Sequence, residues 1–304
     1  MVEFAQLLAQ GIAWGSVYAL IALGYTMVYG VLRLINFAHG DVYMVGAFIA
    51  FYAITYAHAG LFAALVISMA GCALLGVIIE RGAYRPLRAH PRLAVLITAI
   101  GVSLFLENGG QLLFGPQPKP FPHELLTGGL ASGLASASAA IERSTGVIIA
   151  KEQLLIIAAA LIMMGGLQLF VAKTKAGKAI RAVAADRGAA SLMGINTDTI
   201  ISLTFVIGSA LAAAAGVLVS LEVAQIDPIM GLMPGLKAFV AAVLGGIGNI
   251  PGAMIGGIIM GIAEYLVVGY ISSSYRDAIA FAILIIILLL KPTGITGKGV
   301  VEKV

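Results

Sequence analysis

Two short runs of polar residues and glycines, one in each half of the chain, have the residue types to hydrogen-bond a small solute. The first is Arg33-Leu-Ile-Asn-Phe-Ala-His-Gly-Asp41, and the second is the glycine-rich stretch around Asn249. The amide and imidazole side chains supply donors and acceptors, and the glycines let the backbone approach a ligand. The candidate residues are Asn36, His39, Gly40, Asp41, Gly248, Asn249, Pro251 and Gly252. The alternative is a pair of surface turns, in which an asparagine caps a helix and the histidine is solvated.

Other chemistry has little support in the sequence. The four histidines are scattered, at His39, His58, His90 and His123. The chain has no His-Glu-x-x-His run, and its one cysteine, Cys72, excludes a Cys-x-x-Cys site. The run Gly294-Ile-Thr-Gly-Lys298 lacks the first glycine of a phosphate-binding loop and the Ser or Thr after the lysine. We therefore predict a protein that is not an enzyme, does not itself hydrolyse ATP, and needs no metal or cofactor.

The composition places most of the chain in a lipid bilayer. Of 304 residues, 61% are hydrophobic and only 11% are charged, whereas a soluble domain carries about 25% charged residues. The mean hydropathy is +1.05 and the isoelectric point is near 9.2. A nucleic-acid partner is excluded despite this basic balance, because a basic patch needs a solvated face that most of the chain lacks. The chain is predicted to be an all-α polytopic membrane protein.

Apolar stretches define the expected spans, since about 20 residues cross the hydrocarbon core. They are residues 7–31, 43–56, 61–79, 93–114, 154–172, 200–221, 236–268 and 278–290. The stretch 236–268 is too long for one ordinary span and contains the glycine-rich run, so we expect two shorter elements around a break. This predicts one transmembrane domain over residues 1–304, with about eight transmembrane helices plus interrupted segments.

Basic residues orient these spans, because Lys and Arg are retained on the cytoplasmic side. Half of the 18 basic residues lie in two short loops. They are Arg81, Arg85, Arg88 and Arg92, then Lys173, Lys175, Lys178, Arg181 and Arg187. Two spans separate the loops, so both can be cytoplasmic and the N-terminus external. The break in 236–268 adds a crossing, which brings the basic tail (Lys291, Lys298 and Lys303) to the cytoplasmic side as well.

The segment 115–151 is then external. It is rich in Pro, Gly, Ser and Ala, and prolines alternate at its start, at Pro116, Pro118, Pro120 and Pro122. Such a composition is typical of extended or irregular chain rather than of a folded domain.

Within the spans, glycines and acids carry further information. Glycines four residues apart predict close helix packing in lipid. They are Gly11 and Gly15, Gly248, Gly252 and Gly256, and Gly257 and Gly261. The acids Glu107 and Glu264 could serve a proton relay, but both lie near the ends of their spans, which favours an interfacial or helix-end role.

The second basic loop, about residues 173–198, predicts a short amphipathic helix. Ile180, Val183 and Ala184 follow helical spacing, with charged residues around them. Gly194 can end the next turn, and residues 196–198 can cap the following span. The apolar side of this helix needs a cover, which could be the membrane surface, the protein's own loops or a groove on a partner.

Several longer runs, highly specific when taken together, cover nearly the whole chain. They are Tyr18-Ala-Leu-Ile-Ala-Leu-Gly-Tyr-Thr-Met-Val-Tyr-Gly30, the run 33–41, Arg181-Ala-x-Ala-x-Asp186 with Gly194-Ile-Asn-Thr-Asp198, Leu203-Thr-Phe-Val-Ile-Gly208, the run 235–248, and Pro251-Gly-Ala-Met-Ile-Gly-Gly257. In these runs the chain resembles the permease subunits of branched-chain amino-acid ABC importers, of the LivH type.

The resemblance implies a bacterial inner-membrane complex. Its members would be this chain, a second permease of the LivM type, two ATP-binding subunits at the cytoplasmic face, and a periplasmic binding protein that delivers leucine, isoleucine, valine or a related solute. The loop 173–198 would be the segment that couples to an ATP-binding subunit. Its implied residues are Gly177, Arg181, Ala184, Asp186, Ala190, Gly194 and Ile195. The run Ala184-Ala-Asp186 departs from the Glu-Ala-Ala form of many importers, and Asp186 and Gly194 are favoured for docking.

Rival functions stay open at this point. In an ATP-independent secondary transporter or small-solute channel, Asn36 and Asn249 would mark a paired half-helix pore. The loop 173–198, with five basic residues, favours the importer because a channel has no need of it. A membrane-embedded enzyme is weaker still. Within the importer family, urea and short amides are alternatives to branched-chain amino acids.

Overall fold

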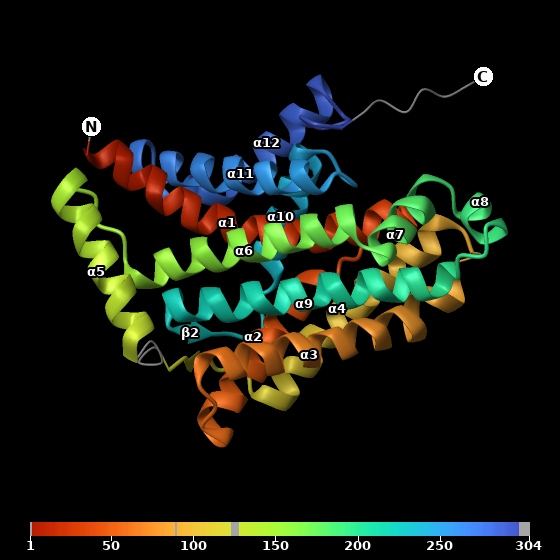
Figure 1. The fold of residues 1–304 in the computed structure, drawn as a ribbon, viewed down its shortest axis with the longest axis horizontal. Coiled ribbons are helices and arrows are strands. Elements are labelled where there is room, and N and C mark those ends of the chain that lie inside the picture. The colour runs from red at the N-terminus through yellow and green to blue at the C-terminus, as the bar shows by residue number, and fades with distance from the viewer. Residues whose placement is uncertain (1, 89, 123–127, 298–304) are drawn as a thin grey trace.

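The chain folds into a helical bundle (Figure 1), and the computed structural model describes residues 2–88, 90–122 and 128–297. The helices are α1 (Val2–Leu32), α2 (His39–Ala57), α3 (Leu61–Ile79), α4 (Arg92–Phe114), α5 (Gly128–Thr145), α6 (Lys151–Lys173), α7 (Lys175–Ala185), α8 (Arg187–Leu192), α9 (Thr197–Val223), α10 (Leu232–Gly245), α11 (Ile250–Tyr270) and α12 (Arg276–Leu290). Short turns η1 (Glu80–Tyr84), η2 (Arg85–Leu87) and η3 (Ser273–Tyr275) and strands β1 (Lys119–Pro120) and β2 (Gln225–Ile226) complete the described elements.

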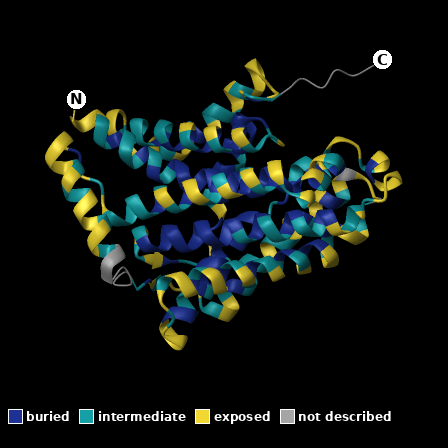
Figure 2. Cartoon of the chain, in the orientation of Figure 1, coloured by how far each residue is buried: buried dark blue, intermediate teal, exposed yellow. Residues whose placement is uncertain are grey.

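Eight helical segments of the described chain are long and apolar enough to cross a membrane. This confirms the predicted all-α polytopic fold. Helices α1 and α9 are mostly buried inside the bundle, whereas α4 and α12 turn most of their apolar surface outward (Figure 2). Several apolar side chains on these helices are exposed, and Leu112 on α4 is 88% exposed. Such exposure suits contact with lipid rather than water.

Glycines bring α1 and α11 into backbone contact, as their spacing predicts. A Cβ atom added to Gly11 would lie 2.7 Å from the Cα of Ile262, and one added to Gly15 would lie 2.8 Å from the Cα of Ile258. Because contacts run from the start of α1 to the far end of α11, the two helices are antiparallel. Close packing of this kind holds helices together where lipid gives no hydrophobic driving force.

The predicted break in the long apolar stretch is confirmed. Helix α10 ends at Gly245 and α11 begins at Ile250. Between them Gly246 and Gly248 have φ angles of +104° and +93°, a region that favours glycine. Helix α10 has only 14 residues and is shorter than the eight membrane-length segments, so the stretch consists of one short helix and one membrane-length helix around the break.

The two basic loops lie at the same end of the bundle. Arg85 and Arg88, which follow α3, pair with Asp198 at the start of α9. At the opposite end lie the N-terminal end of α1 and α5 (Figure 1), and there β1 pairs with β2 in an antiparallel register. Both basic loops therefore lie on one side of the bundle, as expected from the two spans that separate them in the sequence. Lys298 and Lys303 of the basic tail lie outside the described residues.

The prediction for residues 115–151 was wrong in its second half. The part with alternating prolines is extended and contains β1, but Gly128–Thr145 forms the helix α5. The prolines stop at Pro122, and the later sequence is rich in alanine with no proline, which favours a helix. The composition averaged over the whole segment does not reveal this change.

Candidate functional site

The first break is short, because α2 already begins at His39. Residues 33–38 join it to α1 and include a turn at residues 37–38. Asn36 points inward, where its Oδ1 accepts a hydrogen bond of 2.9 Å from the Tyr84 hydroxyl. Ile35 and Phe37 are half-buried. The amide oxygen expected to meet a solute is therefore bonded within the protein.

The other predicted residues of this segment lie in helix contacts. His39 is 1% exposed and packs edge-on against Tyr25, with ring centroids 4.8 Å apart. A Cβ on Gly40 would lie 2.5 Å from the carbonyl oxygen of Gly231, just before α10. Asp41 accepts a hydrogen bond of 2.5 Å from Ser103 on α4. These residues join the start of α2 to α1, α4 and the start of α10, and none of them lines the cavity described next.

The second break lines an open cavity of about 750 Å³ at the end of the bundle that carries α7. Gly248, Asn249 and Pro251 lie in its wall, whereas Gly252 packs against Gly245 of α10. The Asn249 amide donates to the hydroxyl of Thr296 at 2.9 Å. The other walls come from the end of α1, from Arg33, from the end of α6 and from α7. The cavity thus brings together both interrupted segments and the predicted coupling loop.

Helix α7 matches the predicted amphipathic helix, and the protein itself covers its apolar face. Ile180 and Val183 are 4% and 2% exposed and lie against neighbouring helices of the same chain. The Gly177 N–H donates to Thr174 at 2.9 Å and so caps the helix start. Arg181 donates to the carbonyl of Val171 on α6. Helix α7 is therefore part of the bundle, and Arg181 and Ala184 line the cavity.

Helix α8 is the element that projects. Asp186 accepts from the Ala189 N–H at 2.9 Å and caps its start, and Gly194, with φ of +82°, ends it. Ala190 is buried, and its carbonyl accepts from the Ile195 N–H at 3.0 Å. The two favoured docking residues, Asp186 and Gly194, thus shape the turn.

Two large apolar side chains at the end of α8 point outward. Leu192 is 90% exposed and Met193 is 82% exposed. Sequence reasoning missed both residues. The sequence signal was a pair of large apolar residues between Ser191 and Gly194, and such an exposed pair favours a partner surface over water.

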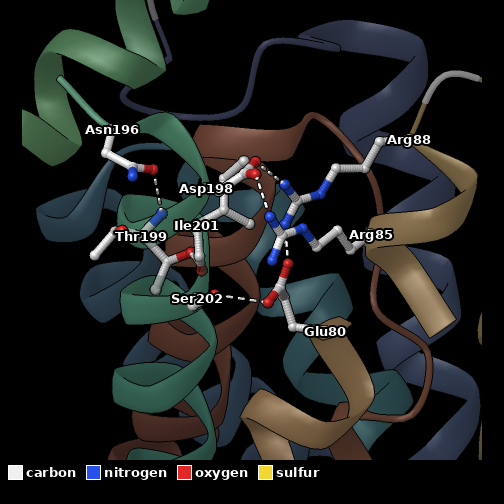
Figure 3. A network of polar contacts seen from close by, with 9 residues as sticks. Glu80, Arg85, Arg88, Asn196, Asp198, Thr199, Ile201 and Ser202 are labelled. Carbon is white, nitrogen blue, oxygen red and sulfur yellow. Dashed lines mark hydrogen bonds and ion pairs between the residues drawn. The ribbon is translucent and has the colours of Figure 1, made fainter. Parts of the chain in front are cut away.

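A buried ion-pair network, also missed, fixes the adjoining turn (Figure 3). Glu80 is fully buried, pairs with Arg88 and accepts a hydrogen bond of 2.6 Å from Ser202 on α9. Arg88 and Arg85 each lie 2.7 Å from an oxygen of Asp198. The sequence signal for this network was Glu80, a single acidic residue beside a loop rich in arginine. The network joins the end of α3 to the start of α9 beside the coupling loop.

A second charged cluster overturns the helix-end interpretation of Glu264. This side chain is fully buried and lies 2.7 Å from Lys237 and 3.2 Å from Arg276, and it accepts from Tyr18 at 2.9 Å. Lys237 also lies 2.7 Å from Asp277. Because both acids are paired with bases, the cluster joins α1, α10, α11 and α12 without net charge.

Metal chemistry has no centre in the described part of the chain, where no group of three or more His, Cys, Asp or Glu side chains could hold an ion. His58 and His90 lie in connections between helices, as expected. His123 lies outside the described residues.

Known proteins match this chain over nearly its whole length. A family model described as branched-chain amino acid transport system / permease component matches residues 7–288. The chain belongs to this permease family. It is 47% identical to the high-affinity branched-chain amino acid transport system permease protein BraD of Pseudomonas aeruginosa, over 99% of this chain and 98% of that protein. It is 46% identical, with the same coverage, to the corresponding LivH of Escherichia coli K12.

The chain also has more distant relatives. It is 29% identical to the probable branched-chain amino acid transport permease protein LivH of Methanocaldococcus jannaschii, over 96% of this chain and 92% of that protein. Among solved structures, PsaBC from Streptococcus pneumoniae in complex with Fab covers 96% of this chain and 91% of its own, with 15% identity and a TM-score of 0.45.

Proposed function

We propose that this permease subunit forms half of the pathway of an ATP-driven importer for leucine, isoleucine or valine. The observation that carries the proposal is the α8 turn, which presents Leu192 and Met193 to the surroundings while α7 behind it lines the cavity. An exposed apolar pair at the end of a membrane bundle suits the groove of an ATP-binding subunit. The names of the BraD and LivH relatives support the substrate class.

The complete complex would contain a LivM-type permease, two ATP-binding subunits and a periplasmic binding protein. The end that carries α7 and α8 would face the cytoplasm of a bacterium, because the basic loops gather there, and the N-terminus would lie outside the inner membrane. The ATP-binding subunits would supply the energy, since this chain lacks a phosphate-binding loop.

Reconstitution tests this assignment. The chain is purified with its partner subunits, placed in proteoliposomes, and supplied with the binding protein and labelled leucine. We expect uptake that requires ATP and all subunits. Uptake by this chain alone, without ATP-binding subunits, would support the channel or secondary-transporter alternative instead. Competition by unlabelled isoleucine and valine, but not by urea or acetamide, is expected.

Two matched variants test docking through the α8 turn. Leu192→Ser is expected to weaken retention of the ATP-binding subunits during purification and to lower uptake. Leu112→Ser is the matched change, because Leu112 on α4 is 88% exposed and Leu192 is 90% exposed. Equal subunit retention in both variants would contradict docking at α8.

A further inference from the structure

The wall of the cavity beside the second break carries positive charge, and no described acidic residue of the wall balances it. Arg33 and Arg181 are the charged residues of its wall, and the wall contains no aspartate or glutamate among the described residues. Arg181 uses one nitrogen on the Val171 carbonyl. No hydrogen bond or ion pair joins the Arg33 guanidinium to any described residue. The cavity therefore offers an open guanidinium fork, which matches a carboxylate or phosphate.

The rest of the wall is largely apolar. Met27 and Val31 contribute from α1, Val171 from α6 and Ile180 from α7. A ligand that fits both parts has an anionic head and an apolar body. A volume of about 750 Å³ lies within the range of small-molecule sites.

At its inner end the cavity narrows between aromatic side chains. A second cavity of only about 10 Å³ is lined by Tyr25, Tyr29, Ile35, Phe239 and Ile247, and it shares Tyr29 and Ile247 with the large one. Tyr25 and Phe239 lie earlier on α1 and α10, and so farther from the α7 end. Their rings meet edge-on with centroids 6.0 Å apart. A water molecule needs at least about 10–15 Å³, so this space leaves no room for a solute at the inner end.

We infer that this cavity binds a free amino acid with an apolar side chain, through its carboxylate at Arg33 and its side chain toward Tyr29 and Ile247. The inference rests on the proposed function and adds a ligand site on the α7 side of the membrane. It also decides between the substrate classes left open by the sequence, because urea and short amides lack the carboxylate that an unpaired arginine attracts. An anionic phospholipid has the same combination of head and tail, and the experiment separates these two sources.

Protection of an introduced thiol measures binding directly. The native Cys72 is the only cysteine and is fully buried, and it is replaced by Ala to remove background. Thr293→Cys then places a thiol in the exposed part of the cavity wall. The full complex carrying both changes is held in nanodiscs, and its reaction with a membrane-impermeant maleimide is timed with and without leucine.

Leucine is expected to slow the reaction in a saturable way, and leucinamide, which has the same side chain but no carboxylate, is expected not to. Arg33→Gln should raise the leucine concentration for half-protection by about 10- to 100-fold, the range for losing a charge-assisted hydrogen bond. Arg33→Lys should recover part of it. Arg81→Gln is the matched control, because Arg81 is exposed at the same end and lies outside the cavity wall.

Three results would overturn the inference: no protection by leucine, equal protection by leucinamide, or protection unchanged in Arg33→Gln. Protection that depends on phosphatidylglycerol and not on leucine would assign the site to lipid and would also overturn it. Leucine uptake by the complex with native Arg33 is measured in parallel. Uptake without protection contradicts only this site, whereas absence of ATP-dependent uptake contradicts the proposed function.

Discussion

The network around Glu80 gives a sharp prediction about stability. Glu80→Gln removes a fully buried charge that faces Arg88, which is itself only 9% exposed. Removing one partner of a buried ion pair costs about 3–5 kcal/mol. Arg88 keeps Asp198 at 2.7 Å, so the lower end, about 3 kcal/mol, is expected.

Asp198→Asn provides the contrast within the same network. The Asp198 side chain is 41% exposed, and its partners Arg85 and Arg88 are 49% and 9% exposed. Because Asp198 itself is open to solvent, its pairs are screened and contribute about 0–1 kcal/mol each. The expected loss is about 1 kcal/mol. At about 2–4 °C per kcal/mol, Glu80→Gln should lower the unfolding midpoint by about 6–12 °C and Asp198→Asn by about 2–4 °C.

Cys72 makes the measurement possible without a label on the surface. It is the only cysteine and is fully buried, so a dye that fluoresces on reaction with thiols reports unfolding during a temperature ramp in detergent. High salt should abolish the effect of Asp198→Asn and leave that of Glu80→Gln, since buried pairs are screened much less. If Asp198→Asn destabilises as much as Glu80→Gln, the assignment of stability to burial is refuted.

Three further tests, which use four substitutions, are expected to give distinct results in the same assay. Gly11→Val should lower the midpoint or prevent folding, because a side chain there overlaps the backbone of α11. Lys237→Met should cost about 2–3 kcal/mol, below the usual range for a buried pair because Glu264 keeps its other partners; an unchanged midpoint would contradict this. Asn36→Ala and Tyr84→Phe break the same hydrogen bond, so the double variant should be no less stable than the worse single one, and additive losses would show independent roles.

Local patterns in the sequence were sufficient for most of the fold. Glycines and a proline mark the break between α10 and α11, and helical spacing marks α7. The cap of α9 was also predicted correctly, since Asn196 accepts from the Thr199 N–H at 3.1 Å. These features depend on neighbours within a few residues. The error at α5 came from averaging over a segment whose composition changes at Pro122, and the first break was predicted too long because α2 already begins at His39.

The candidate site was harder to predict because its geometry depends on distant partners. Residues 33–38 form no regular helix or strand, and which of their side chains point inward is decided by partners such as Tyr84, 48 residues from Asn36. Glu80 meets Ser202 across 122 residues. No spacing rule contains such information. The polar residues singled out in the first break therefore lie in packing contacts, while the unpaired Arg33 was noticed only as the start of a run.

The arrangement of α7 explains how the two parts of the proposed function could act on each other. The same short helix carries the α8 turn at one end and supplies Arg181 and Ala184 to the cavity wall. It is joined to α6 by the Thr174 cap and by the bond from Arg181 to Val171. Helices α7 and α8 are joined at Asp186, whose backbone is extended, so a displacement applied at Leu192 by an ATP-binding subunit would reach the cavity through two short helices in series. His39 and Asp41 lie a further layer inside, so the first effect of such a displacement would be on the cavity and on any amino acid bound there.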